Sequence, residues 1–166
     1  EKLENKAFLP GIPLPPQLTI VTDIEAACQK RELIVAAVPS QFLRSVIQKI
    51  AHIHLEHTII CNVAKGIENN SMMTMSEVLE DVLKHERREN LAILSGPSLS
   101  VEVSRKVPTA VVAAAYKEKT ARVVQDAFMT RYFRVYLNED LRGVELGGAI
   151  KNVIAVGAGI SDGAGF

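Results

Sequence analysis

The chain has 166 residues, of which 48% are hydrophobic and 23% are charged, and its formal net charge is zero. This composition supports the buried core of one large domain, or of one domain and a piece of another, and it argues against a disordered chain. The zero net charge gives no support to nucleic-acid binding, which normally shows as an excess of basic residues.

Three further features bear on where the protein works. Cys28 and Cys61 are too few for a disulfide scaffold, so we expect reduced thiols in an intracellular protein. The first ten residues contain no apolar segment of the kind found in secretory signals. Residues 143–166 are long and apolar enough to suggest a membrane span, but Glu145, Lys151 and seven glycines argue against it. We therefore expect no membrane insertion.

Strands and helices alternate along the chain. A proline-rich loop at 10–16 precedes a short strand at 18–23, and Asp23 is placed to cap the helix after it. Residues 33–39 form a continuous apolar, β-branched run, which is typical of a strand buried on both faces of a parallel sheet. This alternation predicts an α/β fold with a mostly parallel sheet. The later predicted elements are strands at 58–64, 91–96, 109–115 and 133–138, helices at 41–53, 72–85, 98–105 and 117–130, and a last helix from Asp140.

Parallel sheets bind ligands at the carboxyl ends of their strands, and three predicted strand ends carry unusual residues. At the first, Pro39 forces a turn and Ser40 is placed to cap the next helix. This segment is either a plain connector or a wall of a nucleotide pocket. At the second, Lys65 beside Gly66 can reach a phosphate or a carbonyl oxygen, unless it is an ordinary exposed lysine.

A third strand end has the sequence LSGPSLS at residues 94–100. Gly96 and Pro97 make a tight turn, and Ser98 then opens a predicted helix. Free N–H groups at the start of a helix suit a polar or anionic ligand, although a plain N-cap is the competing explanation.

Lys151 interrupts a helix of apolar and very small residues. Such residues leave room for a ligand, and apolar surroundings can lower the pKa of a lysine, which suits proton transfer. The alternative is a lysine whose stem lies on apolar surface and whose charge stays in water. On a helical wheel the larger aliphatic side chains lie mostly opposite Lys151, and its own side holds Val144, Gly147, Gly148, Ile154, Ala155, Ala158 and Asp162.

The histidines do not predict a metal site. His52, His54 and His57 give the spacing H-x-H-x-x-H, but no acidic or cysteine partner accompanies them at ligand spacing. A solvated helix end is the expected explanation, and we assign no metal to this chain.

The strand ends together resemble one family, the NAD(P)-dependent glycerol-3-phosphate dehydrogenases of the bacterial and organellar type. The resemblance implies an incomplete Rossmann-type parallel sheet followed by the first helix of an α-helical C-terminal domain. It divides the chain into a partial dinucleotide-binding domain at 1–138, without its first βαβ unit, and the start of a helical substrate domain at 139–166. The matching segments, in the family's order, are FLPGIPLP, IVAAVPSQFLR, AKGIE, LSGPSLSVEVSRKVPTAVV and FRVYLNEDLRGVELGGAIKNVIAVGAGISDGAGF.

The resemblance also implies a reaction. Hydride passes between C2 of glycerol 3-phosphate and C4 of the nicotinamide of NAD or NADP, which interconverts the alcohol with dihydroxyacetone phosphate. The product glycerol 3-phosphate feeds glycerophospholipid synthesis. Lys151, in the motif GGAxKN, is the implied acid/base group. The implied substrate contacts are Lys65, Gly96, Ser98 and Asn152, and the implied cofactor contacts are Pro39, Ser40, Lys65 and Ser100, the last at a position where the family often has alanine.

Two departures from the family pattern bear on activity. The chain contains no G-x-G-x-x-G turn, which normally cradles the pyrophosphate, and no arginine-asparagine segment after GAGF. We therefore expect a piece of a longer enzyme, a cytoplasmic or organellar homodimer, whose 166 residues alone bind the dinucleotide poorly and show no turnover. The alternatives are a related dehydrogenase of the 6-phosphogluconate or 3-hydroxyacyl-CoA type and a non-catalytic interaction module.

Overall fold

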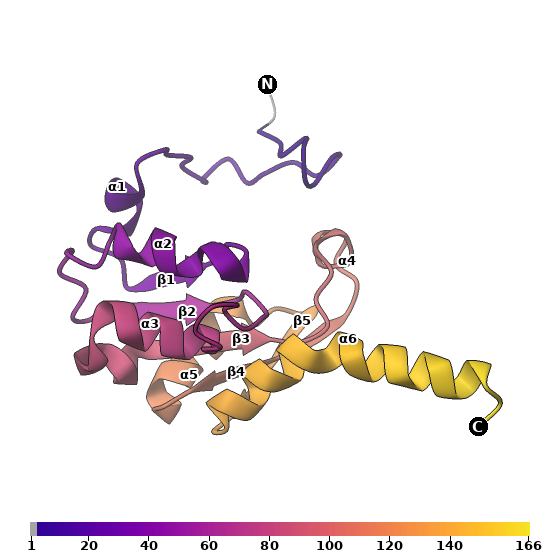
Figure 1. Ribbon diagram of the computed structural model, residues 1–166. Coiled ribbons are helices and arrows are strands. Elements are labelled where there is room, and N and C mark those ends of the chain that lie inside the picture. The colour runs from indigo at the N-terminus through magenta and orange to yellow at the C-terminus, as the bar shows by residue number, and fades with distance from the viewer. Residues whose placement is uncertain (1–2) are drawn as a thin grey trace.

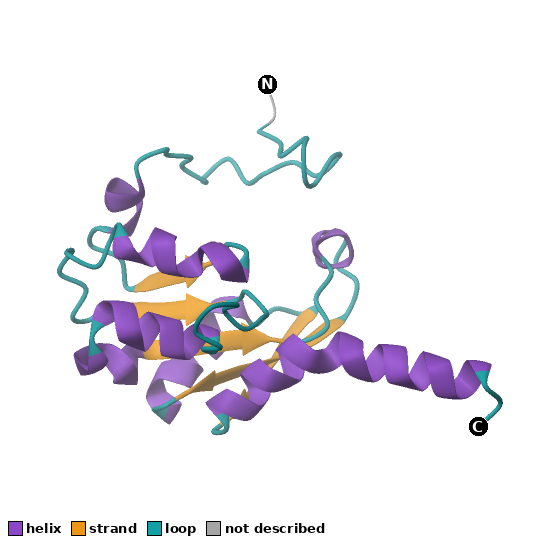
Figure 2. Ribbon diagram, viewed as in Figure 1, coloured by secondary structure: helices purple, strands orange, loops and turns teal. Residues whose placement is uncertain are grey.

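A five-stranded sheet forms the centre of the protein. The structure is a computed structural model that describes residues 3–166, without the side chains of residues 85–87. The strands lie in chain order across the sheet, with helices packed against it (Figures 1 and 2). They are β1 (Leu33–Ala36), β2 (Ile59–Asn62), β3 (Leu91–Ser95), β4 (Thr109–Ala115) and β5 (Phe133–Asn138).

The helices follow the predicted alternation, but several are shorter than the sequence suggests. The segment at 41–53 becomes a 3-10 turn and a short α-helix, and the helix expected at 98–105 contains only five helical residues. The α-helices are α1 (Ile24–Cys28), α2 (Leu43–Gln48), α3 (Met75–Leu83), α4 (Ser100–Ser104), α5 (Glu118–Phe128) and α6 (Leu141–Gly163), and the 3-10 helices are η1 (Ser40–Phe42) and η2 (His85–Asn90).

The sheet is mostly parallel, which confirms the prediction. Strands β1, β2 and β3 run parallel, β4 pairs antiparallel with β3, and β5 runs parallel to β4. The antiparallel pair arises because the connection 96–108 turns back at the edge where β3 ends. The carboxyl ends of β1, β2 and β3 therefore share one edge of the sheet.

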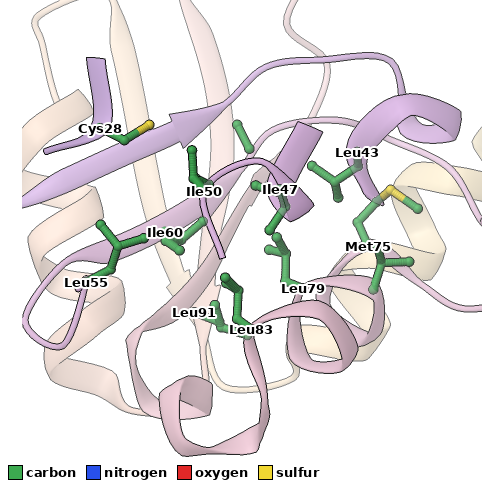
Figure 3. Close-up of a cluster of buried hydrophobic side chains, with 12 residues drawn as sticks. Cys28, Leu43, Ile47, Ile50, Leu55, Ile60, Met75, Leu79, Leu83 and Leu91 are labelled. Atoms are coloured by element: carbon green, nitrogen blue, oxygen red, sulfur yellow. The ribbon is translucent and has the colours of Figure 1, made fainter. Parts of the chain in front are cut away.

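Buried side chains fill both faces of the sheet. On one face, α2 and α3 pack over a cluster that includes Leu43, Ile47, Leu79 and Leu91 (Figure 3). On the other face, α5 packs through Val124 against a second cluster, which includes Ala113 and Val135 of the sheet. Side chains alternate between the two faces along a strand, so Ile93 shares the face of Leu91, and α6 packs there through Leu141. Helices α3 and α6 therefore cover the same face.

Three local predictions are wrong. Residues 18–23 form no strand, and Ile20 is 62% exposed, because no strand of the described chain pairs with this segment. Ser40 makes no cap hydrogen bond and is instead the first residue of η1. Helix α4 begins at Ser100, two residues after Ser98. The predicted cap at Asp23 is confirmed, since its side chain accepts a hydrogen bond from the N–H of Glu25. The last helix, expected from Asp140, begins at Leu141, and Asp140 caps it by accepting from the N–H of Gly143.

The second half of α6 extends away from the sheet (Figure 1). Val153 and Ile160 on this half are 73% and 68% exposed. Among the helices within residues 3–166, α6 alone is long and apolar enough to cross a membrane. The core helices of many soluble proteins share this length and composition, so a single such helix is weak evidence of a span.

The turn after β3 requires glycine at position 96. Gly96 has a φ of +151°, and a Cβ there would lie 2.9 Å from the Cα of Val111. Gly96→Ala is therefore expected to lower the free energy of unfolding by about 1–3 kcal/mol, because neither the backbone angle nor the neighbouring strand accommodates a side chain. Urea denaturation followed by circular dichroism measures the loss.

Gly157→Ala is the control for Gly96→Ala. It lies in the exposed half of α6, where a Cβ meets nothing within 4 Å, and alanine favours helix, so no loss of stability is expected. Equal stabilities of the two variants would contradict the requirement for glycine at position 96.

Candidate functional site

The carboxyl ends of the three parallel strands bring the predicted site segments to one edge of the sheet. Pro39 and Ser40 follow β1, Lys65 follows β2, and Gly96 follows β3. The parallel register of the strands places these segments side by side. This is the edge at which open parallel sheets bind ligands.

The first two strand ends contact each other directly. Gly66 has a φ of +144°, and a Cβ at this position would lie 2.6 Å from Oγ of Ser40. The side-chain amide of Gln41 donates a hydrogen bond to the carbonyl of Ile67 at 2.8 Å and accepts one from the N–H of Asn69 at 3.0 Å. The turn that follows Lys65 is therefore fastened to the residues that follow β1.

An ion pair fastens the same turn further along. Arg44 of α2 donates to both carboxylate oxygens of Glu68, at 2.9 and 3.2 Å from its Nε, and also pairs with Asp81 of α3. The hydrogen bonds from Arg44 lower the pKa of Glu68. Arg44 thus connects α2, α3 and the turn that begins at Lys65.

The backbone immediately before Lys65 is fixed by a buried asparagine. Asn62, 2% exposed, donates through Nδ2 to the carbonyl of Ala64 at 2.8 Å and accepts at Oδ1 from the N–H of Ala64 at 3.2 Å. Lys65 itself is half-buried. The backbone on either side of Lys65 is hydrogen-bonded, to Asn62 at the preceding residue and to Gln41 two residues later.

Helix α6 brings Lys151 to this edge. Burial lowers the pKa of Lys65, and the nearby positive charge of Lys151 lowers it further. The approach depends on Gly148, where a Cβ would lie 2.5 Å from Oγ of Ser95 and 3.6 Å from Cγ of Lys65. Lys151 lies about one turn beyond Gly148 and is exposed. The two predicted lysines are therefore neighbours, although 86 residues of sequence separate them.

Part of the predicted floor beneath Lys151 differs from the wheel. Gly148 and Val144 face the sheet as the wheel suggests, but Ile154 is 66% exposed. The larger aliphatic residues on the opposite side, such as Val153 and Val156, are also exposed rather than packed. The small-residue contact is thus confined to the turn of α6 around Gly148.

The remaining predicted site residues lie near the edge without firm contacts to the lysines. Pro39, Ser98 and Ser100 are exposed, and Oγ of Ser98 lies 3.4 Å from the carbonyl of Gly96, to which it donates. Asn152 is exposed next to Lys151. These residues follow the strand ends or adjoin Lys151, and their contacts with a ligand stay predictions.

Sequence reasoning gave no site role to Glu145, which lies two turns before Lys151 in α6. It is 9% exposed, and its carboxylate accepts hydrogen bonds from the N–H and the Oγ of Ser76, at 2.8 and 2.5 Å. Burial raises its pKa. The signal was present in the sequence, since Glu145 falls on the same helical stripe as Leu141 and Gly148.

A small cavity of about 10 Å³ separates Glu145 from the turn of Lys65, and Asn62 and Ser95 also line it. A space of this size holds about one water molecule. Polar groups from α6, β2 and β3 therefore meet beside the turn of Lys65.

The histidines point to separate partners. Nε2 of His52 lies 3.2 Å from a carboxylate oxygen of Glu25, and Nε2 of His54 lies 3.2 Å from one of Glu56. In the described part of the chain, no three histidine, cysteine or acidic residues gather closely enough to hold a metal ion.

Family comparisons cover most of the chain. Residues 1–121 match the model of the NAD-dependent glycerol-3-phosphate dehydrogenase N-terminus, and residues 140–166 match that of the C-terminus of the same family. The chain is similar to the glycerol-3-phosphate dehydrogenases [NAD(P)+] of Syntrophomonas wolfei and Anaeromyxobacter dehalogenans, with 48% and 50% identity over 163 residues. These matches cover 98% of this chain and 48% and 49% of the two relatives.

Solved structures agree with these sequence matches. The crystal structure of glycerol-3-phosphate dehydrogenase from Coxiella burnetii superposes with a TM-score of 0.83 at 33% identity, over 96% of this chain and 48% of that one. The chain therefore spans about half the length of the curated relatives it matches. With both family models matched in order, this chain belongs to the NAD-dependent glycerol-3-phosphate dehydrogenase family.

Proposed function

We propose that the protein containing this chain interconverts glycerol 3-phosphate and dihydroxyacetone phosphate with NAD or NADP. The observation that carries the proposal is the pair Lys65 and Lys151, held together at the carboxyl edge of the parallel strands. Two ammonium groups at such an edge suit a small anionic substrate with an oxygen that gains charge during reaction. The family matches favour this reaction over the 6-phosphogluconate and 3-hydroxyacyl-CoA alternatives.

Lys151 is the proposed acid/base group. Reduction of the C2 ketone develops negative charge on its oxygen, and an ammonium beside it stabilises that charge and donates a proton. Lys65 supplies a second positive charge from the neighbouring strand end. Gly96, Ser98 and Asn152 complete the proposed substrate contacts.

The bound dinucleotide would supply or accept the hydride. Pro39, Ser40, Lys65 and Ser100 are the residues that would hold it. The fit rests on the turn at Gly66, whose positive φ and contact with Ser40 expose backbone at the edge without an intervening side chain. Residues 1–166 contain no G-x-G-x-x-G turn, so they offer part of a dinucleotide site.

The remaining assignments follow from the same proposal. We infer a dinucleotide domain at 1–138 and the start of a substrate domain at 139–166, which the separate family matches at 1–121 and 140–166 support. The whole protein is proposed to be a homodimer of the cytoplasm or an organelle, without nucleic-acid binding or membrane insertion. Its glycerol 3-phosphate would feed glycerophospholipid synthesis.

The lysine roles can be tested in the longest natural protein that contains this sequence. Lys151→Met is expected to lower kcat for dihydroxyacetone phosphate reduction by about 10²–10⁴-fold, because the proton donor is lost. Lys65→Met is expected to lower kcat/KM as well, through weaker substrate binding. Steady-state kinetics with NADH and NADPH measures both effects.

Lys119→Met is the control, since Lys119 is an exposed residue of α5, on the other face of the sheet. Wild-type turnover of the Lys151→Met variant would overturn the assignment. So would faster oxidation of 6-phosphogluconate or of a 3-hydroxyacyl-CoA than of glycerol 3-phosphate.

The coupling of the lysines predicts a pKa change. Lys151→Met is expected to raise the pKa of Lys65, because one of the two causes of its depression is removed. An NMR titration of the Lys65 ε-carbon measures the change, and the Lys119→Met variant should leave it in place. An unchanged Lys65 pKa in the Lys151→Met variant would show that the two charges do not interact.

The lowered pKa of Lys65 also predicts a pH-dependent stability. A lysine whose pKa is depressed by folding contributes stability above its unfolded pKa of about 10.4, and this stability is lost as pH falls through the folded pKa. Lys65→Met is therefore expected to raise the free energy of unfolding at pH 7. The gain should shrink towards pH 10.5 in urea denaturation, and a gain independent of pH would contradict the linkage.

A further inference from the structure

Glu145 is a buried carboxylate in the part of α6 that packs against the sheet. Its two oxygens accept from the backbone N–H and the hydroxyl of Ser76, which is the second residue of α3. That N–H is one of the first-turn donors that a helix leaves without an internal acceptor. The carboxylate also lies at the positive end of the α3 dipole.

The beginning of α3 has a second set of capping interactions besides Glu145. Thr74 and Glu77 already form a complete capping box, in which each side chain accepts from the backbone N–H of the other residue. Burying a further carboxylate costs free energy, which agrees with the raised pKa of Glu145. The capping box uses the N–H groups of Thr74 and Glu77, so Glu145 satisfies the remaining donors of the buried Ser76 and in doing so joins α6 to α3.

The contact with Ser76 fixes the rotation and the height of α6. Arg142, about one turn before Glu145, donates to Glu77 at 2.8 Å, so two residues of α6 form hydrogen bonds with the first turn of α3. One turn after Glu145, Gly148 lies against Ser95. Lys151 follows Glu145 by six residues, about 9 Å along the helix axis, and a slip of one residue would rotate it by about 100°.

We propose that Glu145 is a positioning residue, whose hydrogen bonds to Ser76 hold α6 in the register that places Lys151 beside Lys65. The inference rests on the proposed function for its effect on turnover. It does not rest on that function for the geometry of the two lysines. Glu145 acts through the length of its side chain and its hydrogen bonds, and not through its charge.

A matched pair of variants separates length from charge. Glu145→Gln keeps the length and one carbonyl acceptor for the N–H of Ser76 and removes the charge. Glu145→Asp keeps the charge and shortens the side chain by one methylene. Both are made in the longest natural protein that contains this sequence, with circular dichroism and thermal unfolding to establish folding.

The two variants are expected to behave differently. Glu145→Gln should retain kcat within about threefold, whereas Glu145→Asp should lose about 100-fold, the effect of misplacing a reacting group by about 1 Å. The KM for the dinucleotide should stay within about twofold in both. The pKa of Lys65 should rise in Glu145→Asp, because Lys151 is no longer held beside it, and should not rise in Glu145→Gln.

Two results would overturn the proposal. A loss of kcat in Glu145→Gln that equals or exceeds the loss in Glu145→Asp would show that side-chain length does not decide the effect, and wild-type kcat with an unchanged Lys65 pKa in a folded Glu145→Asp would show that Ser76 does not set the register. Should Glu145→Asp fail to fold, Glu145→Ala replaces it, with the same expected and contrary results. If the wild-type protein does not reduce dihydroxyacetone phosphate, the proposed function fails, while the Lys65 pKa in the same variants still decides the role of Glu145.

Discussion

The close approach of α6 to the sheet edge is the constraint on which the site depends. Two positive charges repel each other, so the neighbourhood of Lys65 and Lys151 must be maintained by interactions elsewhere. Gly148 permits the approach, since any side chain there would overlap Ser95. Burial of Leu141 and the hydrogen bonds of Glu145 hold the helix in place against the repulsion.

The turn that carries Lys65 is also held in place by hydrogen bonds. Lys65 extends from a turn whose backbone is fixed by Asn62 before it and by Gln41 and Arg44 after it. These residues come from β2, η1 and α2, so the turn joins the two strand ends into one rigid unit. The backbone of such a turn loses little conformational entropy when Lys65 meets a ligand, which favours binding.

Much of this arrangement could be predicted from the sequence. Apolar runs predict β1 to β5, and the rule that ligands bind at the carboxyl ends of strands predicts roles for Lys65 and Gly96. Residues 18–23 look like a strand, but strand formation needs a pairing partner, which local pattern does not reveal. Glu145 was missed for a related reason: its partner, Ser76, is distant in the sequence, and only packing of α6 on α3 brings the two together.

The free energy stored in the lysine pair bears on what the edge binds. In the protein alone, burial and repulsion from Lys151 both disfavour the ammonium of Lys65, which is why the pKa of Lys65 falls. An anion between the two lysines would offset both effects, because each positive charge would gain an opposite partner. A doubly charged phosphate ester gains more from this than a neutral alcohol does. The same positioning that costs stability in the free protein therefore favours a small anion over an uncharged molecule at this edge.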